Sequence, residues 1–143
     1  MTLVWSEELS IGNALIDTDH KNLILKTNDV VQAIKSRDAS ELMMAFDQLE
    51  SSLNTHFVNE EKVAHAIHFS FEKNEADHKS ILAILKRIKG AVASMIAHKG
   101  AMTEDAVDHY SEFLCDWLTN HVINEDMLLK PALKEYPYDY TPD

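Results

Sequence analysis

Apolar residues recur at intervals of three and four positions in four long stretches of the chain. This interval places apolar side chains on one face of an α-helix, because a helix completes a turn in about 3.6 residues. The pattern is clearest in the second stretch, with Leu42, Phe46, Leu49, Leu53 and Phe57. It predicts four amphipathic helices, at about residues 18–37, 40–67, 72–98 and 103–129.

Residues suited to helix ends set these boundaries. Asp17, Thr18 and Asp19 are acidic or hydroxyl residues that can cap a helix, so we expect the first helix to begin near them. Gly100 marks the end of the third helix, and Thr103 caps the fourth. The chain has only three Gly and three Pro, so its connections are short. Long helices with short connections predict an all-α, up-down-up-down four-helix bundle.

The length of 143 residues suits a single domain. We expect residues 1–143 to form one unit, with an N-terminal arm over 1–16 and a C-terminal tail over 130–143. Pro137 and Pro142 lie among tyrosines, and this composition predicts an extended, loosely packed end.

Charge and composition exclude several classes of function. The net charge is −11, and no run of basic residues exceeds the Lys86-Arg87 pair. This disfavours binding to nucleic acid or an anionic membrane, because both need a basic surface. There is no signal-peptide pattern and no apolar run near the ~20 residues that span a bilayer. We therefore expect a cytoplasmic protein, and a monomer. Cys115 is the only cysteine, so no internal disulfide can form, and its apolar neighbours predict a buried, inert thiol.

The second helix carries the first candidate chemistry, in His56 and Glu60. Residues four positions apart lie within about 40° on one helix face, so this pair can bind one cation. The same spacing also occurs on wet helix surfaces. Here, however, Leu53 and Phe57 place the pair beside the core-facing stripe. A buried histidine and carboxylate need a metal or a hydrogen-bonded network.

The fourth helix offers His121 with two acidic residues after it. Glu125 follows four positions later and shares the face of His121 in a regular helix. Asp126 follows five positions later, about 140° away, and reaches the same site only if the helix widens locally, as a π-helical turn would do. Spacing alone leaves both carboxylates open.

The first and third helices each add a histidine near their starts. In an antiparallel bundle these starts lie level with the ends of the second and fourth helices. Four histidines therefore converge, namely His20, His56, His78 and His121. Together with two or three carboxylates, they predict a carboxylate-bridged pair of metal ions. We do not expect metal binding by the histidines that lie farther along the helices, which are His65, His68, His98 and His109.

Three stretches combine into a recognisable set of motifs. They are Val4-Trp5 with Ile11-Gly12 and Ile16-Asp17-Thr18-Asp19-His20-Lys21, then His56-Phe57-Val58-Asn59-Glu60-Glu61, and finally Trp117-Leu118-Thr119-Asn120-His121 with Asp126. The first resembles the N-terminal arm and first ligand of the bacterial hemerythrins. The second and third resemble the HFxxEE and WLxxHxxxxD motifs of that family. The resemblance covers about residues 1–130.

The resemblance implies a non-heme site with two Fe ions that binds O2 reversibly. Glu60 and Asp126 would bridge the irons beside an oxo or hydroxo group. His20 and His56 would hold the iron with the open coordination position. The resemblance favours Asp126 over Glu125, so a π-helical turn becomes a prediction. The metal ligands that it implies are His20, His56, Glu60, His78, His121 and Asp126.

One position departs from the family pattern. The family carries HxxxH on the third helix, whereas here Asn74 stands in the first position and His78 in the second. Water or nothing, the carboxamide oxygen of Asn74, or Glu75 can take the missing place. Glu75 has the E-x-x-H spacing of ferritin-like di-iron proteins. Losing a histidine should weaken metal retention at that iron, and adding a carboxylate should favour its ferric state. Either change predicts faster autoxidation of the irons than in a relative with the complete set of histidines.

Three classes of function are compatible with these features. The first is an O2-binding protein that serves as carrier, store or sensor, with O2 or a similar diatomic as its partner. The second is a di-iron oxidase or peroxidase, or an NO-handling protein. The third is a metal-poor helical interaction module. The resemblance favours O2 binding over catalysis.

Overall fold

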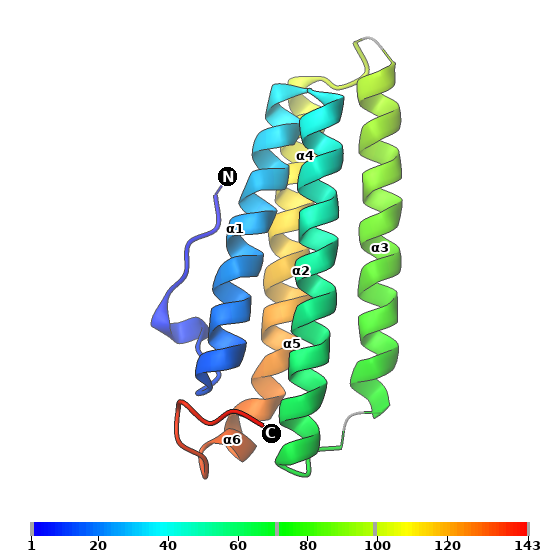
Figure 1. Ribbon diagram of the computed structural model, residues 1–143. Coiled ribbons are helices and arrows are strands. Elements are labelled where there is room, and N and C mark those ends of the chain that lie inside the picture. The colour runs from blue at the N-terminus through cyan, green and yellow to red at the C-terminus, as the bar shows by residue number, and fades with distance from the viewer. Residues whose placement is uncertain (1, 71, 99, 143) are drawn as a thin grey trace.

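Four long helices form most of the molecule in a computed structural model (Figure 1). The structure describes residues 2–70, 72–98 and 100–142, and only the backbone of 72–75. The long helices are α1 (Ala14–Ser36), α2 (Ala39–Ala66), α3 (Glu72–Ala97) and α4 (Glu104–Trp117). They run alternately up and down, and the described ranges contain no strand. The predicted all-α bundle is confirmed.

The last helix of the bundle changes its winding part-way along. After α4, residues Leu118–Ile123 are π-helical, and the chain continues as α5 (Asn124–Asp126), a 3₁₀ turn (Met127–Leu129) and α6 (Lys130–Leu133). A π-helical turn contains an extra residue, so it aligns positions that an α-helix would place apart. The widened turn, which we expect if Asp126 rather than Glu125 shares the site of His121, is confirmed.

The first helix begins one turn earlier than expected. Its N-cap is Asn13, whose side chain accepts a hydrogen bond from the Ile16 amide at 3.1 Å. Asp17 is buried in the first turn, and its carboxylate accepts hydrogen bonds from the Ile11 amide and the Tyr138 hydroxyl. The start predicted near Asp17 was therefore wrong, because Asp17 binds the arm and the tail instead of capping the helix.

The C-terminal tail packs against the start of α1, so the expected loose tail was also wrong. The Tyr138 carbonyl accepts a hydrogen bond from the Ala14 amide at 2.8 Å, and the Tyr140 carbonyl accepts one from Asn13 Nδ2 at 2.9 Å. Leu133 of α6 is buried beside them in a small apolar cluster. Asn13 and Tyr140 are 127 positions apart, so no local pattern predicts this contact.

Two apolar clusters fill the bundle at different levels. The larger one joins the four long helices and includes Leu23, Leu53, Phe57, Leu85, Trp117 and Ile123. The smaller one lies where the start of α1, the end of α2 and the C-terminal segment meet, and it comprises Ile11, Ile16, Val63, Ala64, Ile67, Leu129 and Leu133. Buried polar residues between these clusters form a layer enclosed by apolar regions. Among the described residues, no helix is long and apolar enough to cross a membrane.

Helix α3 is attached to the bundle mainly through α2, beside which it stands at the edge of the molecule (Figure 1). The His78 ring stacks on the Phe57 ring of α2, with centroids 3.8 Å apart. Farther along, the apolar residues of α3 join the larger cluster, namely Ile81, Leu85, Ile88 and Val92. One face of α3 is thus packed, and its start carries His78 to the level of the polar layer.

Candidate metal centre

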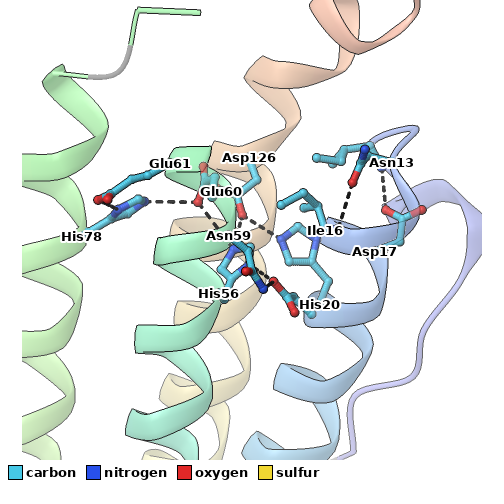
Figure 2. A network of polar contacts seen from close by, with 12 residues as sticks. Asn13, Ile16, Asp17, His20, His56, Asn59, Glu60, Glu61, His78 and Asp126 are labelled. Atoms are coloured by element: carbon cyan, nitrogen blue, oxygen red, sulfur yellow. Dashed lines mark hydrogen bonds and ion pairs between the residues drawn. The ribbon is translucent and has the colours of Figure 1, made fainter. Parts of the chain in front are cut away.

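The polar layer contains five buried ionisable side chains that point toward one another (Figure 2). They are His20 from α1, His56 and Glu60 from α2, His78 from α3, and Asp126 from α5. Their ligand atoms form two groups, and within each group these atoms lie within 4.8 Å of one another. We name them the first group (His20, His56 and Asp126) and the second group (Glu60, His78 and Asp126). Asp126 belongs to both.

The first group converges on one carboxylate oxygen. His20 Nε2 and His56 Nε2 each lie 2.7 Å from Asp126 Oδ2. The preceding π-helical turn brings Asp126 to the interior, where it is 3% exposed, and leaves Glu125 on the surface. Of the two acidic residues that spacing left open, Asp126 is the one at the centre of the bundle.

The orientation of His56 depends on two residues outside the first group. Asp19 Oδ2 lies 3.2 Å from His56 Nδ1 and also accepts a hydrogen bond from Asn59 Nδ2 at 3.0 Å. A carboxylate beside Nδ1 holds a proton on that nitrogen and leaves Nε2 as the metal-binding atom. These roles of Asp19 and Asn59 were not predicted from the sequence. The available signal was the position of Asn59, three residues after His56 and on nearly the same helix face.

The second group is built around Glu60, which is fully buried. Glu60 Oε2 lies 3.2 Å from His78 Nε2 and 3.5 Å from His56 Nε2. Even so, neither oxygen of Glu60 accepts a hydrogen bond of normal geometry from the described residues. His78 is held on its other side by the Phe57 ring, and its Nδ1 lies 3.9 Å from Glu61 Oε1.

The two central carboxyl groups differ in protonation. Burial raises the pKa of Glu60 to about 11, and the negative charge of Asp126 adds to the shift. Burial also acts to raise the pKa of Asp126, but hydrogen bonds from His20 and His56 outweigh it and hold that pKa well below its usual value. Without a cation, Asp126 therefore carries the negative charge and Glu60 keeps its proton at neutral pH.

The histidines of the two groups also differ in protonation. Burial acts to lower the pKa of His56, but hydrogen bonds to Asp126 and Asp19 outweigh it and raise the pKa to about 9. Burial lowers the pKa of His78 to about 4, against the attraction of Asp126. His78 is thus neutral at neutral pH, in the form that binds a metal, whereas His56 must first release a proton.

These residues fit metal cations. Without a metal, the buried Glu60 keeps its proton beside the charged Asp126 carboxylate, and a cation between Glu60, His78 and Asp126 would take the place of that proton. Imidazole nitrogens combined with carboxylate oxygens suit iron and similar transition metals. Because Asp126 belongs to both groups, two cations held by them would be neighbours joined through its carboxylate.

Three predicted ligands are not placed in either group. The His121 side chain is exposed and lines pockets beside the second group, so its assignment as a ligand stays a prediction. The side chains of Asn74 and Glu75 lie outside the described residues, and their roles stay predictions too. Four histidines are exposed and lie outside both groups, namely His65, His68, His98 and His109.

Openings flank α3 beside the second group. A pocket of about 200 Å³ lies between α3 and α4 and has an apolar wall that includes Ile81, Phe113 and Trp117. On the other side of α3, a groove of about 390 Å³ reaches Phe57 and His78. The groove therefore reaches the second group at His78, whereas the pocket between α3 and α4 is lined by none of the three members of that group.

Sequence comparison matches the whole of this arrangement to a known domain. The Hemerythrin HHE cation binding domain matches residues 12–133, a range that contains both ligand groups. The chain belongs to the hemerythrin family. Membership in this family implies non-heme iron binding by the domain.

Curated relatives of this hemerythrin-family chain are bacterial. A bacteriohemerythrin of Pseudomonas aeruginosa is 26% identical over 125 residues, which cover 87% of this chain and 76% of the relative. That of Stenotrophomonas maltophilia is 25% identical over 134 residues, covering 94% and 83%. That of Aquifex aeolicus is 26% identical over 117 residues, covering 81% and 86%. The similarity to each relative thus extends over most of the hemerythrin-family chain.

Proposed function

We propose that this chain binds two non-heme iron ions and uses them to bind O2, or a similar diatomic ligand, reversibly. The observation that carries the proposal is the position of Asp126, whose Oδ2 lies 2.7 Å from both first-group histidines while its carboxylate also belongs to the second group. A carboxylate shared in this way would keep two metal ions side by side. Such a protein would act as an oxygen carrier, store or sensor.

Each residue has a role in this proposal. His20 and His56 would hold one iron, and His78, with His121 as a further donor, would hold the other. Glu60 and Asp126 would bridge them, since Glu60 Oε2 lies near both His56 and His78. The iron pair, when bound, supplies the electrons that O2 binding requires. Asp19 would keep His56 in the metal-binding tautomer through its contact with Nδ1.

The apolar surroundings support binding rather than turnover. Ile24, Leu53, Phe57 and Trp117 are all at most 5% exposed and belong to the larger apolar cluster. A wall of this kind excludes the water and protons that drive the release of reduced oxygen species. The bound diatomic ligand would then be released without being reduced.

A second candidate function is oxidation, peroxide chemistry or NO handling. It is favoured by the openings beside the second group and by Asn74, which stands where the family has a histidine. A missing ligand would leave an exchangeable position on the second iron. The convergence of five buried ionisable side chains on two groups with ligand atoms within 4.8 Å argues against a metal-poor interaction module, because a cation binds such a set of donors.

Anaerobic reconstitution with Fe²⁺ tests the proposal. Iron would be counted per chain, and O2 would then be titrated while absorbance is followed through cycles of deoxygenation. We expect two irons and a coloured form that regenerates in each cycle. Irreversible decay of that form would favour the oxidase alternative. Near-zero iron in a fully helical protein would overturn both the proposed O2 binding and the oxidase alternative.

Replacing Asn74 tests the role of the missing ligand in this function. The Asn74→His variant restores the family pattern, so its oxygenated form should persist longer than that of the parent before autoxidation. The half-life of the coloured form would be measured in air-saturated buffer. An unchanged half-life with the same iron content would show that the missing histidine does not control autoxidation.

A further inference from the structure

A small pocket beside the second group collects further metal-binding side chains. Its volume is about 10 Å³, close to that of one water-sized particle. Five of its lining residues carry potential ligands, namely Asp77, His78, His121, Glu125 and Asp126. The other residues that line it are apolar. Three of these five residues are acidic, namely Asp77, Glu125 and Asp126.

The pocket is continuous with the second group through two shared residues. His78 and Asp126 line the pocket, are at most 8% exposed, and belong to the second group. The third member of that group, Glu60, is fully buried, and neither of its oxygens accepts a hydrogen bond of normal geometry from the described residues. A cation bound at the second group would therefore lie beside the pocket and be attracted by the acidic side chains that line it.

Two walls of the pocket supply carboxylates outside both ligand groups, namely Asp77 and Glu125, of which Glu125 was the alternative to Asp126 that helical spacing left open. Asp77 is half-buried on α3, next to His78. Glu125 is on α5, next to Asp126, and its exposed side chain lines the same pocket. Neither carboxylate belongs to the second group, whose ligand atoms lie within 4.8 Å of one another, so both side chains would have to turn toward a bound cation. Three carboxylates around one small space repel one another unless a positive charge lies between them. Oxygen and imidazole donors on facing walls are what a transition-metal cation binds.

We propose that Asp77 and Glu125 supply carboxylate donors to the second metal ion, in the place that the family fills with a histidine of the third helix. This inference rests on the proposed function, because it names ligands for one of its two metal ions. With these two carboxylates, the second metal ion would have more oxygen donors than the metal ion held by the first group. Such a position would prefer harder cations, with Mn²⁺ and Fe³⁺ bound more strongly relative to softer ions.

Titration with Mn²⁺ tests this assignment without reference to O2. The variants are Asp77→Asn, Glu125→Gln and the double variant, which keep the side-chain shapes and remove the charges. Free Mn²⁺ would be measured by electron paramagnetic resonance, and helicity by circular dichroism. We expect the double variant to bind its second Mn²⁺ about 10- to 100-fold more weakly than the parent, with the first ion unchanged. Each single variant should show a smaller loss at the same ion.

Asp116→Asn is the matched control. Asp116 is an exposed carboxylate on α4 that lines a neighbouring pocket together with His121, but it is not among the residues that line the small pocket. Its replacement removes the same charge from the same side of the bundle. Both Mn²⁺ ions should bind to this variant as they do to the parent, so a loss confined to the double variant would separate ligation from general charge effects.

The outcomes distinguish this inference from the proposed function. If the double variant binds its second ion as tightly as Asp116→Asn does, the inference is overturned, and Asn74 or Glu75 becomes the candidate for the missing place. If the parent takes up two ions but does not bind O2, the proposed function fails, whereas loss of the second ion in the double variant still supports the inference. A parent that binds no metal overturns both.

Discussion

The two ligand groups share Asp126 but are built in different ways. In the first group, His20 and His56 are fully buried on helices that pack along one another, and Asp19 fixes the orientation of His56. In the second group, His78 is 8% exposed, lies on the peripheral helix α3 and is flanked by pockets. One half of the centre is enclosed by the bundle core, and the other half borders pockets beside α3.

The difference follows from how each half is supported. Side chains on both sides enclose the first group, so its ligand atoms need little rearrangement to hold a cation. The second group depends on α3, which is attached mainly through α2 and contacts the centre through a stacked ring. We infer that the first position retains its metal more strongly and that the second exchanges metal and external ligands more readily.

Replacing the shared carboxylate should have the largest effect. Asp126→Asn keeps the shape of the side chain but removes the charge that both groups use, so both metal ions should be lost. We expect iron content near zero after reconstitution, with affinity lower by at least about 100-fold at both positions. Helicity should stay near that of the parent. Retention of one tightly bound iron would show that the two groups do not depend on a common ligand. Exposed Glu112 on α4, changed to Gln, is the control.

Replacing one histidine at a time should separate the two halves. In His78→Gln the second group loses its imidazole, so we expect one retained iron per chain. In His20→Gln the enclosed first group is damaged, and the remaining iron at the open second position should be removed faster by a chelator. Iron per chain and the rate of chelation would be measured for both variants. Equal rates for the remaining iron would contradict the contrast between an enclosed and an open half.

The pH dependence of the metal-free protein should show a smaller effect. Folded pKa values of about 9 for His56 and about 11 for Glu60 lie above their ordinary values of 6.5 and 4.5. Between pH 6.5 and 9 the folded state therefore binds more protons than the unfolded state, and the free energy of unfolding should fall as pH rises. The pKa of His78 is lowered to about 4. His78 therefore affects the pH dependence of the free energy of unfolding below pH 6.5, outside this window.

Urea unfolding of the metal-free protein at pH 6.5 and at pH 9 would measure this fall. Glu60→Gln replaces a protonated carboxyl group by a neutral amide, so its stability should change less across the same window. Metal binding should instead strengthen as pH rises, because His56 and Glu60 release protons when they bind a cation. A parent whose stability is constant from pH 6.5 to 9 would show that these protons are not held in the folded state.

Local patterns in the sequence predicted a large part of this molecule. The interval between apolar residues predicted the four long helices, because burial of one helix face repeats with the helical turn. The resemblance to the hemerythrins selected Asp126 as a ligand, and its five-residue spacing from His121 then predicted the π-helical turn. Asp17 was misinterpreted as a capping residue, since a short acidic side chain suits either role. Its partner Tyr138 is 121 positions away, and no local signal connects the two.

By itself, the sequence predicted which histidines and carboxylates are candidate ligands and which face of each helix presents them. Only the tertiary structure decided how those faces meet: that Asp126 lies at both groups, that Glu60 contacts His78 across α2 and α3, and that Asp77 and Glu125 line one pocket. It also placed the His121 side chain at the surface. The physical reason is that periodicity records burial along one helix, whereas the rotation and separation of neighbouring helices depend on side chains packed from all of them.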